Sequence, residues 1–296
     1  MNDAIQPMQG NNTRVLVLGA TGMLGNAMLR LFAQSAGFDA FGSARSTRAF
    51  QLLSEDLADR VVCGVDVENM DSLVSVFTKT RPDIVINCIG LVKQLAEADD
   101  PLVAIPTNTL LPHRLARLCD LARARLVHMS TDCIFSGSKG MYTETDASDA
   151  KDLYGRSKFL GEVDYPHAIT LRTSIIGHEL GGARSLIGWF LAQTDCVKGY
   201  KRAIFTGLPT VELARVIRDH VIPHPELHGI YHVSAAPISK FELLTLVAQT
   251  YGKTIDISAD DQLVIDRSLD CTRFRRATGF APKPWPELIS SMRDFG

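Results

Sequence analysis

The stretch "VLVLGATGMLG", residues 15–25, indicates how this chain begins to fold. The apolar run at 14–20 is typical of a buried strand, and apolar residues three and four apart predict a helix over 23–36. Gly19, Gly22 and Gly25 lie at the junction. Glycines there let a tight turn bring bare backbone against a pyrophosphate, whose charge the helix N-terminal amides stabilise. Because a strand precedes them and a helix follows, we interpret the turn as a nucleotide-binding loop rather than a purely structural turn.

The first half of the chain continues this alternation of strands and helices. Further strands are predicted at 39–44, 60–66, 83–90, 125–131 and 168–174, and helices at 70–80, 107–123 and 153–164. Pro112 either starts or kinks the third of these helices. Several strands are apolar almost throughout, as strands covered on both faces must be. The pattern predicts an α/β fold of the Rossmann type, with a doubly wound parallel sheet.

The pattern loosens after residue 175, which predicts a second, smaller part of the molecule. We predict a nucleotide-binding domain over 13–174, to which a segment at about 204–232 returns. Residues 175–203 and 233–296 are then expected to form a C-terminal substrate-binding lobe.

Composition limits the classes of partner. The chain has 31 lysines and arginines against 33 aspartates and glutamates, a net charge of −2, which gives no electrostatic basis for binding nucleic acid or an anionic membrane. The N-terminus lacks the features of a signal peptide, and no window approaches the ~20 apolar residues of a membrane span. Six cysteines without CxxC spacing are typical of reduced thiols. We expect a soluble, cytoplasmic protein that binds small molecules or proteins.

Two further patterns have ordinary explanations. Four histidines recur every four residues from His220 to His232, but Pro223 and Pro225 would break any single helix through them, so no metal site is predicted. The basic, amphipathic stretch 114–126 fits a crossover helix with a solvated stripe and is a candidate homodimer surface.

The end of the second strand bears on which dinucleotide binds. The segment "GSARS" carries no carboxylate where an NAD-selective site would present one to the ribose. Ser43, Arg45 and Ser46, with Arg48 nearby, could instead bind a 2′-phosphate through charge-assisted hydrogen bonds. The alternative is a solvated basic turn. We predict NADPH as the cofactor, with NADH possible.

The segment "LYGRSKFLGE", residues 153–162, places Tyr154 and Lys158 four apart on one predicted helix, so both side chains can face one pocket. A nearby ammonium favours the phenolate and is expected to lower the pKa of Tyr154 from its usual ~10. Thr131, at the end of the fifth strand, could donate a hydrogen bond to a carbonyl oxygen beside the tyrosine. The pair could be an ordinary helix surface, but its position near the cofactor edge of the sheet favours catalysis.

Five motifs carry a resemblance to a known family: "GATGMLG", "MSTDCIFSG", "YGRSKFLGE", "LRTSIIG" and "GIYHVSAAPISKFELL". Over residues 13–290 the chain resembles extended short-chain dehydrogenase/reductases, most closely the branch of dTDP-4-dehydrorhamnose reductase and related nucleotide-sugar reductases. The resemblance implies that Thr131, Tyr154 and Lys158 are catalytic and that Asn108 supports a proton relay to the lysine.

The same resemblance implies hydride transfer from NADPH to the keto carbon of a 4-keto-6-deoxy nucleotide sugar, linked to dTDP or UDP. Tyr154 would supply the proton, Thr131 would orient the carbonyl, and Lys158 would anchor the nicotinamide ribose. Further cofactor contacts are expected in the glycine loop and at the ends of the later strands: Thr21, Met23, Leu24, Asp66, Val67, Cys88, Ile89, Gly90, Arg172 and Ser174.

Differences from the motifs of related enzymes limit the reactions that the protein could catalyse. Nucleotide-sugar dehydratases carry a carboxylate and a tyrosine where this chain has Cys133 and Phe135, which argues against water elimination. An epimerase, or a non-catalytic regulatory subunit like the β subunit of methionine adenosyltransferase, stays as an alternative. Ile175 and Ile176 stand where the related reductases often have an aromatic residue that packs on the sugar, so the sequence does not identify the sugar of the substrate. The candidate substrate contacts, each of which could equally be structural, are Asp132, Cys133, Ser185, Trp189, Lys201 and Arg202.

Overall fold

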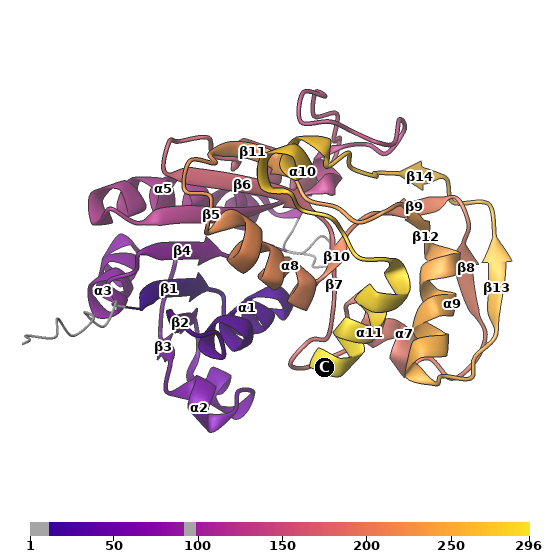
Figure 1. Ribbon diagram of the computed structural model, residues 1–296, viewed down its shortest axis with the longest axis horizontal. Helices are drawn as coiled ribbons and strands as arrows, with labels where there is room; N and C mark the ends of the chain where they lie inside the picture. The colour runs from indigo at the N-terminus through magenta and orange to yellow at the C-terminus, as the bar shows by residue number, and fades with distance from the viewer. Residues whose placement is uncertain (1–11, 92–98) are drawn as a thin grey trace, which may run out of the picture.

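The computed structural model describes residues 12–91 and 99–296 (Figure 1). Seven parallel strands form one sheet in the order β11-β6-β5-β4-β1-β2-β3. The strands are β1 (Thr13–Leu18), β2 (Phe38–Ala44), β3 (Val61–Cys63), β4 (Ile84–Asn87), β5 (Arg125–Thr131), β6 (Ala168–Thr173) and β11 (Gly229–His232). The predicted Rossmann-type fold is confirmed. The strand order reverses between β1 and β4, and in such sheets ligands bind at the carboxyl ends of the strands beside this point.

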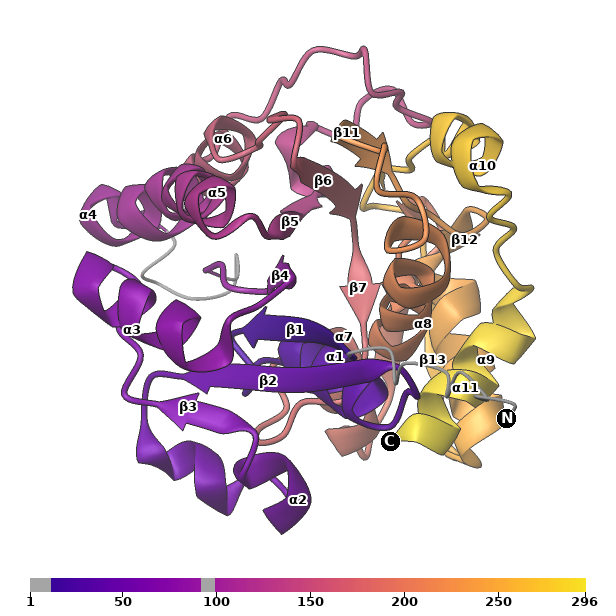
Figure 2. The same cartoon turned by 60° about the vertical axis from the view of Figure 1, so that its left-hand side comes forward.

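Helices cover both faces of this sheet (Figure 2). One face packs against α1 (Met23–Ala33) and α8 (Thr210–Val216), and the other against α3 (Met70–Thr80) and α5 (Leu111–Ala122). Strand β1 shows why its sequence is apolar throughout: Val15 and Val17 belong to the first core, whereas Leu16 and Leu18 belong to the second.

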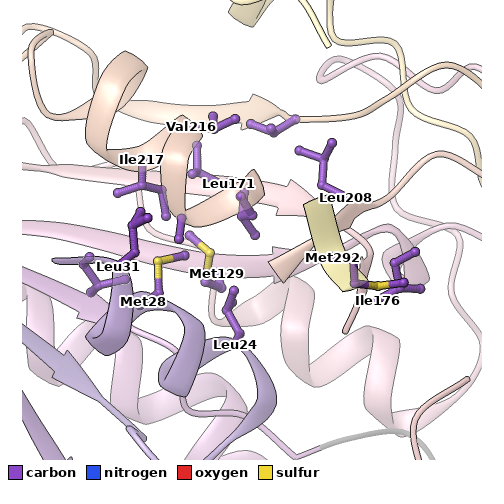
Figure 3. Close-up of a cluster of buried hydrophobic side chains, with 14 of the residues drawn as sticks. Leu24, Met28, Leu31, Met129, Leu171, Ile176, Leu208, Val216, Ile217 and Met292 are labelled. Atoms are coloured by element: carbon purple, nitrogen blue, oxygen red, sulfur yellow. The ribbon is translucent and has the colours of Figure 1, made fainter. Parts of the chain in front are cut away.

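The first core also joins the C-terminus to the sheet (Figure 3). Met28 of α1, Met129 of β5 and Leu171 of β6 lie in the same buried cluster as Val216 of α8 and Met292 of α11 (Trp285–Phe295). Each is at most 7% exposed, so each contributes roughly 1.5–3 kcal/mol to folding by burial. The last helix is thus part of the main core.

The later segments build a smaller lobe beside the carboxyl ends of the strands (Figure 1). Its small sheets have the orders β12-β9-β14, β13-β8 and β10-β7. Its elements are β7 (Ile175–Ile176), α7 (Leu186–Ala192), β8 (Val197–Tyr200), β9 (Ala203–Phe205), β10 (Leu208–Pro209), β12 (Ile238–Ser239), α9 (Lys240–Tyr251), β13 (Ile257–Asp260) and β14 (Ile265–Asp266). Between them, α8 packs on the large sheet and β11 forms its edge strand, and α10 (Thr272–Thr278) lies beside β11. The domain boundaries stay a prediction.

The predicted helices differ from the observed ones mainly at their ends. The helix predicted at 153–164 is α6 (Leu153–Leu160), and the one predicted at 107–123 is preceded by α4 (Pro101–Ala104) and the π-helical segment η3 (Ile105–Leu110), which runs into α5. A wide turn suits this place, because prolines at 106 and 112 cannot donate regular helical hydrogen bonds. The remaining short helices are η1 (Thr47–Gln51), α2 (Glu55–Ala58), η4 (Asp132–Ile134) and η5 (Ile217–Val221).

Candidate active site

The glycine loop is shaped by close backbone contacts. Gly19 has φ +83°, and a Cβ on it would lie 2.9 Å from Cγ1 of Ile89. A Cβ on Gly25 would lie 2.1 Å from the carbonyl oxygen of Gly19. Gly22 is exposed and precedes α1 without a side-chain cap, so the first amides of the helix are left for a ligand. The loop therefore fits a pyrophosphate, which Thr21, Met23 and Leu24 would contact through backbone groups.

The residues predicted to select the dinucleotide differ in their exposure. Ser43 is 1% exposed, and its hydroxyl accepts a hydrogen bond from the Gly19 amide (3.4 Å), so it supports the glycine loop, and its contact with a 2′-phosphate stays a prediction. Arg45, Ser46 and Arg48 are exposed. Ser46 caps η1 by accepting from the Arg48 amide (3.2 Å). Two arginines are thus available at the edge of the loop.

The ends of β3 and β4 carry the other predicted cofactor contacts. Asp66 is exposed, Val67 and Ile89 are half-buried, and Gly90 is exposed. Burial raises the pKa of the Cys88 thiol to about 12, so this residue is a neutral packing group. A Cβ on Gly90 would lie 3.5 Å from Nζ of Lys158. Gly90 therefore lies directly beside the predicted catalytic lysine.

Strand β5 and helix α6 bring the predicted catalytic groups together. Asp152 caps α6 by accepting from the Gly155 amide (2.7 Å), which fixes the start of the helix. The hydroxyl of Thr131, at the end of β5, is hydrogen-bonded to Tyr154. Nζ of Lys158 is buried and donates to the carbonyl oxygen of Met129 (2.7 Å). The three side chains thus meet at the carboxyl edge of the sheet.

The ionisation of the tyrosine differs from the prediction. Burial raises the pKa of Tyr154 above its usual value, and the hydrogen bond with Thr131 opposes this only in part. The expected lowering by Lys158 is absent, because the lysine is directed toward the Met129 carbonyl. Burial lowers the pKa of Lys158 itself to about 8, against the opposing charge of Glu162. Tyr154 is therefore a neutral phenol, the form that can donate a proton.

Asn108 connects three segments around the lysine. It lies 1% exposed in the π-helical segment, a type of turn often found at functional sites. Its Oδ1 accepts from the Leu91 amide (3.0 Å), and its Nδ2 donates to Oγ of Ser157 (3.1 Å). The end of α6 approaches so closely that a Cβ on Gly161 would lie 1.9 Å from the Asn108 carbonyl oxygen. Asn108 and Lys158 are thus held in a fixed arrangement.

Arg172, predicted as a cofactor contact, has its side chain engaged within the protein, and the contact stays a prediction. Its guanidinium forms a buried ion pair with Glu162 (Nη2 to Oε2, 2.7 Å) and donates to Nε2 of His232 (3.2 Å). Glu162 also accepts from the Ser130 hydroxyl (2.7 Å). Burial and the charge of Arg172 lower the pKa of His232 to about 3, so the imidazole stays neutral and accepts at Nε2. This buried network connects β5, β6 and β11 next to the catalytic residues and so supports their positions. Ser174 is half-buried, and its contact with a cofactor stays a prediction.

The substrate candidates fall into two groups. Asp132 is 7% exposed and accepts from Thr131 (3.3 Å), and Cys133 is half-buried next to it, so both belong to the catalytic cluster. Ser185 caps α7 by accepting from the Gly188 amide (3.2 Å), which is its structural role.

The three other candidates lie within the smaller lobe. Trp189 is 39% exposed on α7. Lys201 and Arg202 form the exposed turn between β8 and β9, where their backbones pair with Asp260 and Ile265. These contacts do not join them to Thr131 or Tyr154, so their part in substrate binding stays a prediction.

Two cations near the site escaped the sequence analysis. Nζ of Lys240 lies 4.2 Å from the ring centroid of Phe205 and interacts electrostatically with Asp132. Nη1 of Arg267 lies 3.8 Å from Sγ of Cys133. The capping box formed by Ser239 with the glutamate three residues later indicates that a helix starts at Lys240. No spacing in the sequence could have placed that lysine opposite β5.

Within residues 12–91 and 99–296, no group of three or more histidine, cysteine or acidic residues is arranged to hold a metal ion. Over the same part of the chain, every helix is too short or too polar to cross a bilayer.

The sheet, the glycine loop and the Thr131, Tyr154 and Lys158 cluster define an oxidoreductase of the extended short-chain dehydrogenase/reductase type. Residues 13–294 match the family described as RmlD substrate binding domain, and the chain belongs to that family. The resemblance inferred from the motifs is thereby confirmed.

Individual relatives cover most of the chain. It is 24% identical to dTDP-4-dehydrorhamnose reductase of Aggregatibacter actinomycetemcomitans over 95% of its length and 99% of the relative. It is 27% identical to methionine adenosyltransferase 2 subunit beta of Danio rerio over 81% and 74% of the two chains. The crystal structure of dTDP-4-dehydrorhamnose reductase from Bacillus anthracis str. Ames in complex with NADP has the same fold, with a TM-score of 0.76 at 20% identity, covering 96% of this chain and 99% of that one.

Proposed function

We propose that this protein reduces the 4-keto group of a 4-keto-6-deoxy nucleotide sugar, linked to dTDP or UDP, in deoxysugar biosynthesis, with NADPH as the hydride donor. The observation that carries the proposal is the convergence of Thr131, Tyr154 and Lys158 beside the glycine loop. The family and the reductases among the relatives support it.

Each residue has a distinct task in this reaction. Bound NADPH supplies the hydride. The Thr131 hydroxyl orients the substrate carbonyl, and Tyr154 protonates the oxygen as negative charge develops on it. The raised pKa of Tyr154 suits this direction, because the phenol holds its proton until a base forms beside it. The Lys158 ammonium, next to Gly90, binds the ribose hydroxyls.

The preference for NADPH rests on charge. Arg45 and Arg48 are exposed at the end of β2, where a 2′-phosphate would lie if the dinucleotide binds as in other Rossmann folds. A guanidinium can bind such a phosphate through paired hydrogen bonds. The NADP complex of the Bacillus anthracis reductase is in keeping with this choice.

One observation favours a second candidate, a regulatory subunit that binds the cofactor without turning it over. The relative from Danio rerio is named as a subunit of methionine adenosyltransferase and matches 81% of this chain. The complete catalytic cluster favours the reductase.

An assay separates these functions. Purified protein is mixed with NADPH and a panel of dTDP- and UDP-linked 4-keto sugars, and the absorbance of NADPH is followed. Stoichiometric oxidation supports the reductase, inversion of the sugar without net oxidation supports an epimerase, and inertness towards the whole panel supports the regulatory subunit. Tyr154→Phe should abolish turnover and leave NADPH affinity unchanged, and full activity in this variant would contradict the assigned proton donor.

We also propose a homodimer and a cytoplasmic location. Leu102, Ile105, Phe159 and Leu160 are 82%, 40%, 41% and 60% exposed on the adjoining elements α4, η3 and α6, an apolar surface that a second copy could cover. Light scattering of the purified protein tests the dimer. No disulfide joins the six cysteines, all within the described part of the chain, which suits a reducing compartment.

A further inference from the structure

The smaller lobe reaches the catalytic loop through the sheet β12-β9-β14. The Asp266 amide of β14 donates to the carbonyl oxygen of Gly137 (2.8 Å), in the loop that follows β5. Arg267 donates from Nε to the Phe135 carbonyl (2.7 Å). Strand β9 pairs with β14 on one side and with β12 on the other, and β12 leads directly into α9. The sheet therefore connects the start of α9 with the loop that follows Thr131.

Lys240 is the first residue of α9, and its ammonium interacts electrostatically with Asp132 and Cys133. It is half-buried, with its ammonium 4.2 Å from the ring centroid of Phe205, within the range of a cation–π interaction. Among the described residues, no carboxylate forms an ion pair with Lys240; the negative charge of Asp132 acts on it from a greater distance. Burial lowers the pKa of Lys240 to about 8, so at neutral pH the group is charged yet poorly solvated.

Such a cation weakens folding unless something compensates for it. The ring of Phe205 offers only a weak interaction, of about 0.5–2 kcal/mol. Perturbed charges of this kind are concentrated at functional sites, where a ligand supplies the missing partner. A bound anion would satisfy Lys240, and Arg267 lies on the same wall beside Cys133.

The position of Lys240 indicates which anion it would bind. Thr131 orients the reacting carbonyl of the sugar, and Asp132, whose charge acts on Lys240, is the next residue. The lysine therefore faces the sugar end of the substrate. A dTDP- or UDP-linked hexulose carries two phosphates, and the nearer one is bonded to the sugar.

We propose that Lys240 binds the sugar-linked phosphate of the nucleotide-sugar substrate. This inference rests on the proposed function and assigns a substrate-binding role to a residue of the smaller lobe. It predicts that Lys240 acts on the second phosphate of a nucleoside diphosphate and has little effect on the first.

The experiment measures nucleotide binding by calorimetry in the presence of saturating NADP+. The ligands are dTDP, UDP and the corresponding monophosphates, and the variants are Lys240→Met, Lys240→Arg and Lys198→Met. Methionine keeps the apolar stem over Phe205 without the charge, and arginine restores the charge. Lys198 is a matched control, because it lies on the same lobe with an exposed side chain, 3.0 Å from its partner Asp260.

We expect Lys240→Met to weaken binding of the preferred diphosphate by about tenfold to a hundredfold, the usual value of a charge-assisted hydrogen bond. Binding of the monophosphate and of NADPH should stay within about threefold of the parent, since a threefold change is well under 1 kcal/mol. Lys240→Arg should recover most of the diphosphate affinity, and Lys198→Met should bind like the parent.

Several results would overturn the assignment. Equal diphosphate affinity in the parent and in Lys240→Met removes Lys240 from the site, while the proposed function stands. Equal losses for monophosphate and diphosphate place the lysine at the nucleoside end and also refute it. If the parent binds NADPH but neither diphosphate and reduces no 4-keto sugar, the proposed function itself fails. Should Lys240→Met lose its thermal transition, Lys240→Gln takes its place, and unchanged diphosphate affinity in that folded variant refutes the assignment.

Discussion

The close approach of Gly161 to Asn108 allows a sharp test of the site's geometry. Gly161 follows the last turn of α6, and its φ of −90° is available to any residue, so Gly161→Ala introduces no backbone strain. Replacing glycine by alanine in such a conformation would ordinarily stabilise a protein by about 0.4–1 kcal/mol. Here the new Cβ would lie 1.9 Å from the Asn108 carbonyl oxygen. The steric clash therefore predicts a loss of stability and activity, whereas the usual effect of replacing glycine by alanine would be a gain in stability.

The size of the effect follows from the distance. Real Cβ contacts are essentially never shorter than 3.0 Å, so the end of α6 and the π-helical segment must separate by at least about 1.1 Å. The hydrogen bond from Asn108 to Ser157, now 3.1 Å, would then be broken, and Lys158 on the same helix would move. A displacement of about 1 Å at catalytic groups costs about a hundredfold in rate, or roughly 2.7 kcal/mol in the activation barrier.

The assay is the steady-state reduction of the best substrate from the 4-keto panel. We expect kcat of Gly161→Ala to fall by about a hundredfold, with a smaller loss of NADPH affinity, because Lys158 moves while the glycine loop is untouched. Gly181→Ala is the matched control, since the nearest atom to its new Cβ is an ordinary 3.9 Å away. Wild-type kcat in a Gly161→Ala protein of unchanged thermal stability would refute the coupling between Asn108 and α6.

Three further predictions concern charge. Arg45→Ala should raise KM for NADPH by about tenfold to a hundredfold and leave KM for NADH nearly unchanged; equal effects in cofactor kinetics would remove Arg45 from the 2′-phosphate site. Because the pKa of Lys158 is about 8 in the folded protein and 10.5 as the ordinary value, its ammonium is lost as the pH rises through 8, and kcat should fall there. In Lys158→Arg, whose guanidinium stays charged, a pH profile should lack this decline even at a lower rate, and an unchanged decline would assign it to another group. Glu162→Gln leaves the buried guanidinium of Arg172 without its counter-ion and should lower the free energy of unfolding by about 3–5 kcal/mol in urea titrations, whereas Asp294→Asn, in an exposed pair, should cost under about 1 kcal/mol; similar losses would contradict the assigned burial.

Local sequence pattern was sufficient for most of the fold. Strands β1, β5 and β6 appear within two residues of their predicted ends, because buried parallel strands must be apolar on both faces. The strand predicted at 83–90 ends early, at Asn87, whose side chain accepts from the Ile89 amide (3.1 Å) and turns the chain. Strand β11 has only four residues, too few for a periodic signal, so pairing with β6 alone defines it.

The site was less accessible to sequence reasoning, because partners far apart in the chain decide what a polar side chain does. Ser43 and Ser46 are three residues apart, yet one supports the glycine loop and the other caps an exposed turn. The guanidinium of Arg172 is paired with Glu162 and with a histidine 60 residues later in the chain. Lys240 approaches Asp132 only through the folding of the smaller lobe. Residues a few positions apart on one helix, such as Tyr154 and Lys158, were the ones that sequence could pair.

The chain returns to the large sheet after the first segment of the smaller lobe. This path determines whether the two parts can be produced as separate fragments. A fragment cut after residue 174 would keep every glycine of the dinucleotide loop but would lack β11 and α8. The backbone groups at the edge of β6 would be unpaired, and the apolar side of α1 would be exposed to solvent. Both changes promote aggregation. Neither half of this protein can therefore be released by one cleavage, and proteolytic nicking should inactivate both together.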